Sequence, residues 1–219
     1  MKILICIITL LIGFIAIGTD ASDSFSINGY YKNFFVVYDM SDALESIWFD
    51  DKPVGIVTNR IRIDSKWKIS NNMVLNTAYN FAPRIQDNNF SLVQIGEYDV
   101  QRRSYRFDDF ESRLYPGKNE TPASFLIYHN LDRANISIST KAADIYIGRQ
   151  AIAWGSARSI NPTDVIVPYS FDELDSEERS GVDAVRLRIP FGFMGEFDAG
   201  YLFGEDFKFE NSAFYLRGK

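Results

Sequence analysis

Cysteine and histidine are almost absent from this 219-residue chain, and their scarcity excludes several kinds of chemistry. The only cysteine is Cys6 and the only histidine is His129. A disulfide framework and a thiolate metal site each need more cysteines than the chain has, and the single histidine stands at a loop edge, where a histidine is far more often incidental than part of a Ser-His-Asp triad. No serine lies in a G-x-S-x-G segment, and no phosphate-binding loop is present. The sequence therefore predicts a protein that is not an enzyme and that needs no cofactor or metal.

Long apolar runs are also missing, except for a short one at the N-terminus. Lys2 gives a positive start, residues 3–17 are nearly all apolar, and Thr19-Asp20-Ala21 provides small residues for cleavage. A membrane-spanning helix needs about 20 apolar residues. This layout favours a secretory signal peptide over residues 1–21 rather than an uncleaved anchor. Cleavage near Ala21 would remove Cys6 and leave a domain over residues 22–219.

Positive charge is in the minority, with 23 Lys and Arg against 29 Asp and Glu and a net charge of -6. Because nucleic-acid binding needs a basic surface, this balance argues against a nucleic-acid partner. Aromatic residues, by contrast, are abundant at 15%, with 12 Tyr and 18 Phe. Aromatic and β-branched residues are typical of strands, and we find no sequence repeat or heptad.

Apolar and polar residues alternate along most of the chain, which is the period of a β-strand. In residues 56–70, for example, Ile61, Ile63 and Trp67 share one face while Arg62 and Lys66 share the other. About eight strands are expected, over 25–39, 56–70, 73–81, 133–139, 143–150, 182–190, 196–203 and 212–219. A further short strand over 90–98 stays open. The connections between strands are long at 39–55, 83–132 and 150–181, short at 71–72, 141–142 and 191–195, and intermediate at 204–211.

Alternating long and short connections are typical of a transmembrane β-barrel, which has short turns at one rim and long loops at the other. Trp, Tyr and Phe also stand near the strand ends, as in the aromatic girdles of such barrels. The sequence therefore predicts an all-β, antiparallel transmembrane β-barrel in the outer membrane. Alternation alone does not say whether an apolar face meets lipid or a core. A secreted or periplasmic soluble β-domain that binds a ligand or glycan remains an alternative, as does a small closed barrel with a structural or enzymatic role.

Charged residues opposite the apolar faces are the candidate pore lining. The Asn71-Asn72 turn predicts Lys66 opposite Asn76 and Arg62 opposite Asn80, so no carboxylate neutralises this basic column from that side. A hairpin symmetric about Gly192 predicts Arg188 opposite Glu196 and Arg186 opposite Asp198, as ion pairs that hold the hairpin together. The predicted pore-lining residues are Arg60, Arg62, Lys66, Lys68, Arg186, Arg188, Glu196 and Asp198.

One segment resembles a known family. Gly148-Arg149-Gln150-x-x-x-Trp154-Gly155 is followed by Asn161-Pro162-x-Asp164 and Pro168. Over roughly 146–188 the chain resembles porin-type outer-membrane β-barrels of Gram-negative bacteria, in families related to alginate-export and similar porins. The resemblance implies a channel for small solutes or ions, contact with outer-membrane lipid and with the barrel-assembly machinery, and leaves a homo-oligomer open. Porins of this kind are larger and end on an aromatic residue, so the 219 residues are also compatible with the N-terminal part of a larger barrel.

The long connection 150–181 is predicted to fold toward the basic column and to narrow the channel. Its acidic run has neither the glycine nor the spacing of a calcium-binding loop. An acidic loop facing a basic wall would set up a transverse field that favours small hydrophilic solutes. The predicted constriction residues are Arg149, Trp154, Arg158, Asp164, Asp172, Glu173, Asp175, Glu177 and Glu178. The alternative, that this connection lies outside in water, stays open.

Overall fold

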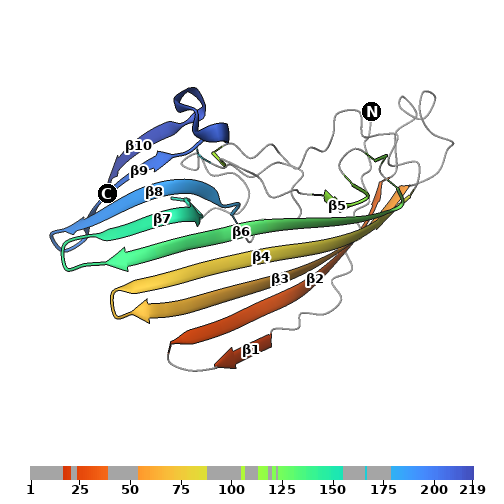
Figure 1. Ribbon diagram of the computed structural model, residues 1–219, viewed down its shortest axis with the longest axis horizontal. Coiled ribbons are helices and arrows are strands. Elements are labelled where there is room, and N and C mark those ends of the chain that lie inside the picture. The colour runs from red at the N-terminus through yellow and green to blue at the C-terminus, as the bar shows by residue number, and fades with distance from the viewer. Residues whose placement is uncertain are drawn as a thin grey trace.

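The chain folds into a single antiparallel sheet, shown in the computed structural model of Figure 1. The structure describes residues 17–20, 24–38, 54–87, 105–106, 113–117, 120–121, 123–154, 166 and 179–219. The strands are β1 (Ile17–Asp20), β2 (Phe25–Tyr38), β3 (Val54–Ser70), β4 (Met73–Gln86), β5 (Arg113–Tyr115), β6 (Phe125–Ser139), β7 (Asp144–Gln150), β8 (Val182–Phe191), β9 (Gly195–Leu202) and β10 (Ala213–Gly218). Two 3-10 turns, Glu205–Phe207 and Phe209–Asn211, precede β10.

The strands lie in the sheet in chain order, and the prediction of an all-β, antiparallel fold is confirmed. The order is β1-β2-β3-β4-β6-β7-β8-β9-β10, and the short β5 pairs with β6. Within the described residues β1 and β10 do not pair with each other, so the sheet is open and closure into a barrel stays a proposal. The strand β1 falls inside the predicted signal peptide, which also stays a prediction.

All eight predicted strands are present, with two differences around the connection expected at 83–132. The strand β4 continues through Pro83 to Gln86, and β6 begins at Phe125 rather than near residue 133. The predicted strand over 90–98 lies outside the described residues, and β5 was not predicted. Proline lacks only one ladder donor, and here it does not end the strand.

A β-bulge in β6 explains why the period was lost there. Ala78 pairs with Arg133, but the next residue, Tyr79, pairs with Leu131, so Asp132 has no partner in β4. The inserted residue shifts the alternation by one. Before the bulge Asn130 lies on the same face as Arg62, and after it Asn135 does. A search for one continuous alternation therefore finds only the second half of this strand.

The short turns lie together at one end of the strands, where successive hairpins are staggered in one direction (Figure 1). Phe25 at the start of β2 pairs with Trp67, and β3 continues past it to Ser70. Asp144 at the start of β7 pairs with Arg188, and β8 continues past it to Phe191. A stagger of constant sense means that the strands are tilted, which is what closure of a sheet requires.

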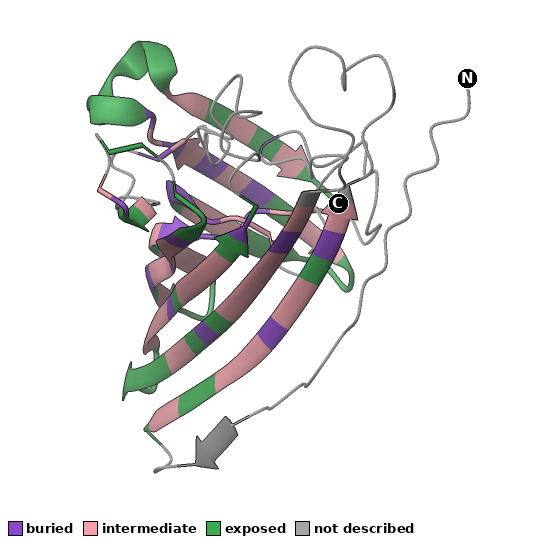
Figure 2. Cartoon of the chain, turned by 90° about the vertical axis from the view of Figure 1, so that its right-hand side faces the viewer, coloured by how far each residue is buried: buried purple, intermediate pink, exposed green. Residues whose placement is uncertain are grey.

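The two faces of the sheet differ in polarity, and the polar face is the buried one. Figure 2 shows buried, intermediate and exposed residues following one another along the strands. On β3, Arg62 is 3% exposed, whereas its neighbours Ile61 and Ile63 are 40% and 51% exposed. We call the face that bears Arg62 the concave face and the opposite one the convex face. Buried polar residues are Lys32, Arg62, Gln86, Arg106, Asp132, Asn135, Arg149, Gln150, Asp183 and Asp198. This is the inverse of a soluble sheet, which buries its apolar side.

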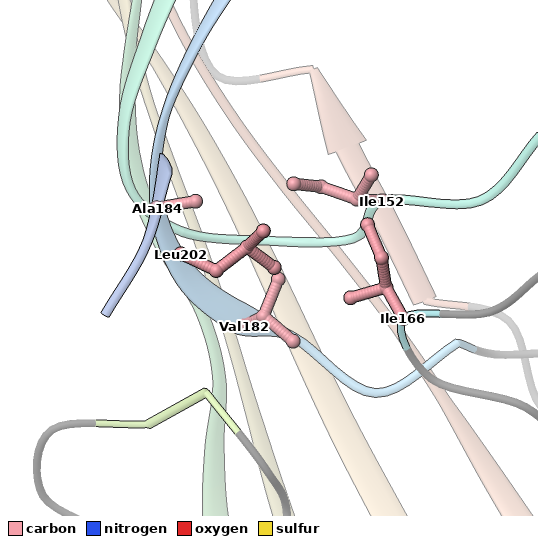
Figure 3. Close-up of a cluster of buried hydrophobic side chains, with 5 residues drawn as sticks. All are labelled: Ile152, Ile166, Val182, Ala184 and Leu202. Carbon is pink, nitrogen blue, oxygen red and sulfur yellow. The ribbon is translucent and has the colours of Figure 1, made fainter. Parts of the chain in front are cut away.

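A cluster of buried apolar residues lies over the end of the concave face formed by β8 and β9 (Figure 3). It comprises Ile152, Ile166, Val182, Ala184 and Leu202. Val182, Ala184 and Leu202 come from the strands, while Ile152 and Ile166 come from the connection that follows β7. The described part of that connection therefore packs onto the sheet.

Candidate functional site

A hollow of about 500 Å³ opens on the concave face and is bordered by strands from β2 to β8. In the flat order of the sheet these two strands are separated by β3, β4, β6 and β7, so the curvature of the sheet brings them to one space. The charged residues that line it are Arg62, Lys66, Arg133, Arg186, Arg188 and Asp64. Five cations thus face one carboxylate in a chain whose net charge is -6.

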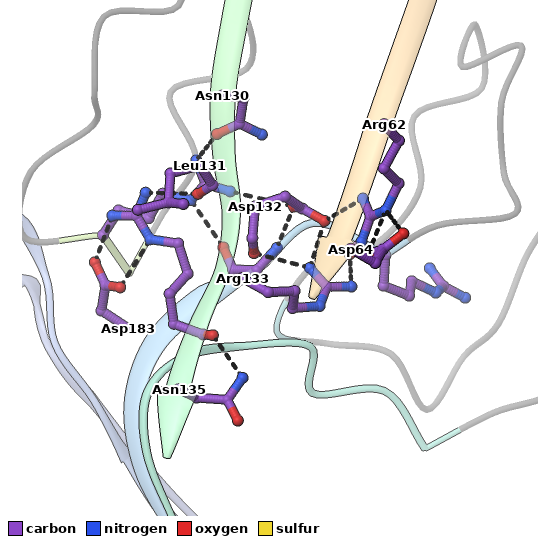
Figure 4. Close-up of polar contacts among 12 residues, drawn as sticks. Arg62, Asp64, Asn130, Leu131, Asp132, Arg133, Asn135 and Asp183 are labelled. Atoms are coloured by element: carbon purple, nitrogen blue, oxygen red, sulfur yellow. Dashed lines mark hydrogen bonds and ion pairs between the residues drawn. The ribbon is translucent and has the colours of Figure 1, made fainter. Parts of the chain in front are cut away.

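The first group that shapes this hollow centres on Asp132, which is 2% exposed (Figure 4). Arg62 Nη1 and Arg133 Nη1 donate to its Oδ2 at 2.8 and 2.6 Å. The backbone N–H of Gly181 donates to its Oδ1 at 3.0 Å, and Arg106 Nη2 lies 3.7 Å from the same oxygen. A buried carboxylate is stable only when it is paired and hydrogen-bonded, and this one has three arginines.

The second group centres on Asp198, which is 1% exposed. Arg186 donates from Nε and Nη2 to its two oxygens at 2.9 and 2.6 Å. Trp154 Nε1 donates at 3.1 Å and the Tyr215 hydroxyl at 3.0 Å. The rings of Trp154 and Tyr215 meet edge to face with centroids 4.8 Å apart. One carboxylate thereby joins β8, β9 and β10 to the chain that leaves β7.

The predicted basic column is correct in register and wrong in its charge balance. Arg62 pairs with Asn80 and Lys66 with Asn76, as the tight turn predicts. Arg62, however, also donates from Nε to Asp64 at 2.9 Å, besides its bond to Asp132. Asp64 lies on β3 itself, and Asp132 lies on β6, beyond the neighbouring strand β4. The pairing of β3 with β4 alone therefore does not reveal either carboxylate.

The members of this column differ in their surroundings. Lys66 borders the hollow and is exposed, and within the described residues it makes no hydrogen bond or ion pair. Arg60 and Lys68 lie on the same face of β3 but do not line the hollow. The predicted pore lining is thus represented at the hollow by Arg62 and Lys66 on this side of the sheet.

In the β8–β9 hairpin the predicted register is wrong, yet the predicted ion pairs form. Arg188 pairs with Asp198, two positions away from the expected Glu196. The turn occupies residues 192–194 and begins with Gly192 at φ +61°, so its centre is one residue later than predicted. Arg186 still reaches Asp198, and Arg188 still reaches Glu196, because a long side chain can contact a diagonal neighbour.

The structure describes two residues of the predicted constriction, Arg149 and Trp154, and they bind different carboxylates. Arg149 is the penultimate residue of β7 and is 4% exposed. It donates from Nε and Nη2 to Asp183 at 2.8 Å each. Its Nη1 also donates to the carbonyl of Leu131 at 3.0 Å, so it joins strands and does not line the hollow. Trp154 lies against Asp198. The predicted residues Arg158, Asp164, Asp172, Glu173, Asp175, Glu177 and Glu178 lie outside the described residues.

The glycine that opens the G-R-Q segment has a structural reason. Gly148 has φ +109°, and a Cβ on it would lie 2.3 Å from the carbonyl oxygen of Ala134 on β6. Only glycine accepts this conformation and this approach of the neighbouring strand. The residue that follows it is Arg149, so the glycine fixes the point from which the arginine reaches Asp183.

Two important residues were not found from the sequence. The alternation places Asp132 in the connection 83–132, because the bulge interrupts the period of its strand. It places Tyr215 in the last strand without assigning it a role. The signal for Tyr215 was present, since Ala213, Tyr215 and Arg217 alternate with the exposed Phe214 and Leu216. For Asp132 the local signal is only the adjacent Arg133, because its other partners come from β3 and from residues 106 and 181.

Other kinds of site find no support in the part of the chain that the structure describes. No group of three or more His, Cys, Asp or Glu residues there is placed to hold a metal ion. No described helix has the length and apolarity to cross a membrane. The chain matches no protein-family model, no curated protein and no solved structure. The function proposed below is therefore argued from the geometry of the sheet.

Proposed function

We propose that this chain forms an outer-membrane, porin-like channel, or part of one, whose passage runs along the concave face. The observation that carries the proposal is the inverted burial of the sheet. Charged and amide side chains are buried on the concave face, while large apolar side chains are exposed on the convex face. In lipid this arrangement is the favourable one, because the apolar face meets the hydrocarbon and the polar face meets the lumen.

The exposed apolar surface is continuous across the sheet. On the convex face exposed residues come from each strand between β2 and β10: Ile27, Phe35, Ile61, Ile63, Trp67, Ile69, Tyr79, Ile85, Phe125, Ile136, Ile147, Val185, Ile189, Phe197, Phe214 and Leu216. Contiguous apolar patches of this kind mark a contact with a membrane or another protein. The tilt of the strands and the short turns at one end of the sheet favour contact with a membrane over contact with another protein, because a transmembrane barrel needs both features.

The passage itself is supported by the hollow and by the residues that pack beside it. Ile152 and Trp154 lie on the concave face, so the connection after β7 reduces the space there. Within the proposal, the short turns lie at the periplasmic rim and the long connections at the outer rim. Small hydrophilic solutes would then pass through the hollow, between Arg62 and Lys66 of β3 and the hairpin of β8 and β9.

A pair of matched variants tests the membrane part. Ile63→Arg places a charge on the convex face in the middle of β3, whereas Asn76→Arg places it on the concave face of β4. In a bilayer the first costs about 2–4 kcal/mol of folding free energy near the midplane, and the second costs little. We expect Ile63→Arg alone to lose the folded band in a heat-modifiability assay after membrane fractionation. A soluble β-domain that binds a ligand or glycan would need no detergent and would tolerate Ile63→Arg.

Planar-bilayer recordings test the channel part. The reconstituted full chain is expected to give discrete conductance steps. A folded, membrane-embedded protein without steps would instead be a barrel whose lumen is filled by side chains, the Asp132 and Asp198 groups among them, and the channel proposal would be wrong.

A further inference from the structure

We propose that the hollow on the concave face is a binding site for a small anion, such as inorganic phosphate or a short carboxylate. This inference deepens the proposed channel by naming the class of solute, and it rests on that proposal only for the solute's passage. The hollow's volume of about 500 Å³ falls within the roughly 300–1,000 Å³ that is usual for small-molecule sites. The argument concerns which hydrogen-bonding groups remain available to a solute there.

The carboxylates around the hollow already have arginine partners. Asp198 receives four hydrogen bonds, two from Arg186 and one each from Trp154 and Tyr215. Asp132 receives bonds from Arg62, Arg133 and Gly181. Both carboxylates are almost fully buried, so a cation that enters meets neither of them. Asp64 is the one carboxylate in the lining, and both of its oxygens accept from Arg62 Nε at 2.9 and 3.1 Å.

Donors, by contrast, remain. A guanidinium carries five N–H groups, and a bidentate carboxylate uses only two of them. Arg186 is engaged with Asp198 through Nε and Nη2, which leaves the hydrogens of Nη1. Arg188 reaches Glu196 through Nη2 and also interacts with Tyr146, and its side chain is 34% exposed, so part of its guanidinium is open to the hollow. Both arginines line the hollow, and their carboxylates hold them in place.

Lys66 completes the site from the opposite wall. It comes from β3, whereas Arg186 and Arg188 come from β8, yet all three border the same space. Its ammonium is not neutralised by any described residue, so it adds a whole charge. An anion between these walls would meet Lys66 on one side and guanidinium N–H groups on the other. Charge-assisted hydrogen bonds of this kind are the strong ones.

Charge selectivity in planar bilayers tests the inference, with Lys68 as the matched control. Lys68 lies on the same strand and face as Lys66 but outside the hollow. Under a KCl gradient we expect the wild-type channel to prefer chloride over potassium. Because charged linings set selectivity at close range, Lys66→Glu should lower the chloride-to-potassium permeability ratio at least about twofold and Lys68→Glu should leave it unchanged. Millimolar inorganic phosphate should reduce the chloride current of the wild type and of Lys68→Glu, but not of Lys66→Glu.

Phosphate titration of the refolded protein in detergent, followed by calorimetry, separates this inference from the channel proposal. Phosphate bound by the wild type and by Lys68→Glu, and lost in Lys66→Glu and Arg188→Gln, supports the site even if no conductance is found. Conductance without chloride preference and without phosphate binding overturns the site and leaves the channel. An equal loss of binding in Lys66→Glu and Lys68→Glu also overturns it, because the effect would then be one of general surface charge. Each variant is first checked for its folded band by heat modifiability.

Discussion

Asp132 and Asp198 are both buried carboxylates on the concave side, but they stabilise their regions in different ways. Asp132 is surrounded by three arginines and one backbone amide. Asp198 has one arginine, and its other donors are the neutral side chains of Trp154 and Tyr215 beside the apolar cluster. The first region is therefore held mainly by charge, and the second by one ion pair with neutral hydrogen bonds and apolar contact.

The difference shows what each carboxylate would leave behind if it were lost. Without Asp132, Arg62 keeps Asp64, but Arg106 and Arg133 lose a buried counter-charge. Without Asp198, one guanidinium loses its partner, while Trp154 and Tyr215 still pack against each other. Breaking a buried pair is costly because it leaves an uncompensated charge, so the cost should follow the number of arginines concerned.

The largest effect is expected for Asp132→Asn. We expect the free energy of unfolding, measured by urea titration of the protein refolded in lipid vesicles, to fall by about 3–5 kcal/mol. The matched control is Asp64→Asn, which removes another partner of Arg62 from a side chain that is 39% exposed. For a pair that is open to water the cost is about 1 kcal/mol or less. Equal losses in the two variants would contradict the assignment of Asp132 as the centre of its region.

A smaller loss is expected for Asp198→Asn, since the amide oxygen can still accept from Trp154 Nε1 and the amide NH2 group can donate to the Tyr215 hydroxyl. Losing the charged partner of Arg186 should cost about 2–3 kcal/mol in the same urea titration. Glu196→Gln, on the same strand and 25% exposed, serves as the comparison. If Asp198→Asn proves more costly than Asp132→Asn, the two regions do not differ as described.

Trp154→Phe tests the neutral part of the Asp198 region. The phenyl ring keeps much of the apolar contact but lacks the indole N–H, so the loss should be about 1 kcal/mol, as for a single hydrogen bond. Tyr215→Phe removes one donor from the same carboxylate and should cost a similar amount. A loss from Trp154→Phe well above that of Tyr215→Phe would mean that the indole's packing matters more than its hydrogen bond.

The smallest effect is expected for Arg188→Gln, whose side chain is 34% exposed and whose partner Glu196 is 25% exposed. Water screens such a pair, so its contribution is on the order of 0.5 kcal/mol. A double-mutant cycle with Glu196→Gln measures the coupling directly. A coupling as large as that between Arg186 and Asp198 would show that the rim of the hollow is less accessible to water than the structure indicates.

The sequence was informative where one period runs through a whole strand. On β3 the alternation of Arg62 with Ile61 and Ile63 predicted both faces, and the Asn71-Asn72 turn predicted the register with β4. That register also depends on an irregularity beside the turn, because Ser70 pairs with Met73 whereas Lys68 pairs with Val74. The ion pairs of β8 and β9 were predicted from a wrong register, because arginine side chains tolerate a shift of one turn residue.

The rest depends on contacts between distant segments. The bulge at Asp132 is set by the pairing of β6 with β4. Apart from the adjacent Arg133, its charged partners are Arg62 on β3 and Arg106, and Gly181 adds a backbone amide. Alternation within one strand carries no record of such partners. Equally, the composition of the connection after β7 does not show whether that connection lies outside in water or folds onto the concave face. The direction of Trp154 follows from Asp198 and Tyr215, which are 44 and 61 positions later in the chain.

The position of Trp154 also bears on the order in which the sheet assembles. The indole leaves β7, but the groups that hold it belong to β9 and β10. If strands are added to the sheet in chain order, the indole gains its acceptor Asp198 with β9, and its ring partner Tyr215 only when β10 has paired with β9. Complete packing of the indole therefore reports that the β9–β10 hairpin has formed. Tryptophan fluorescence during refolding should therefore contain a late phase that Tyr215→Ala removes.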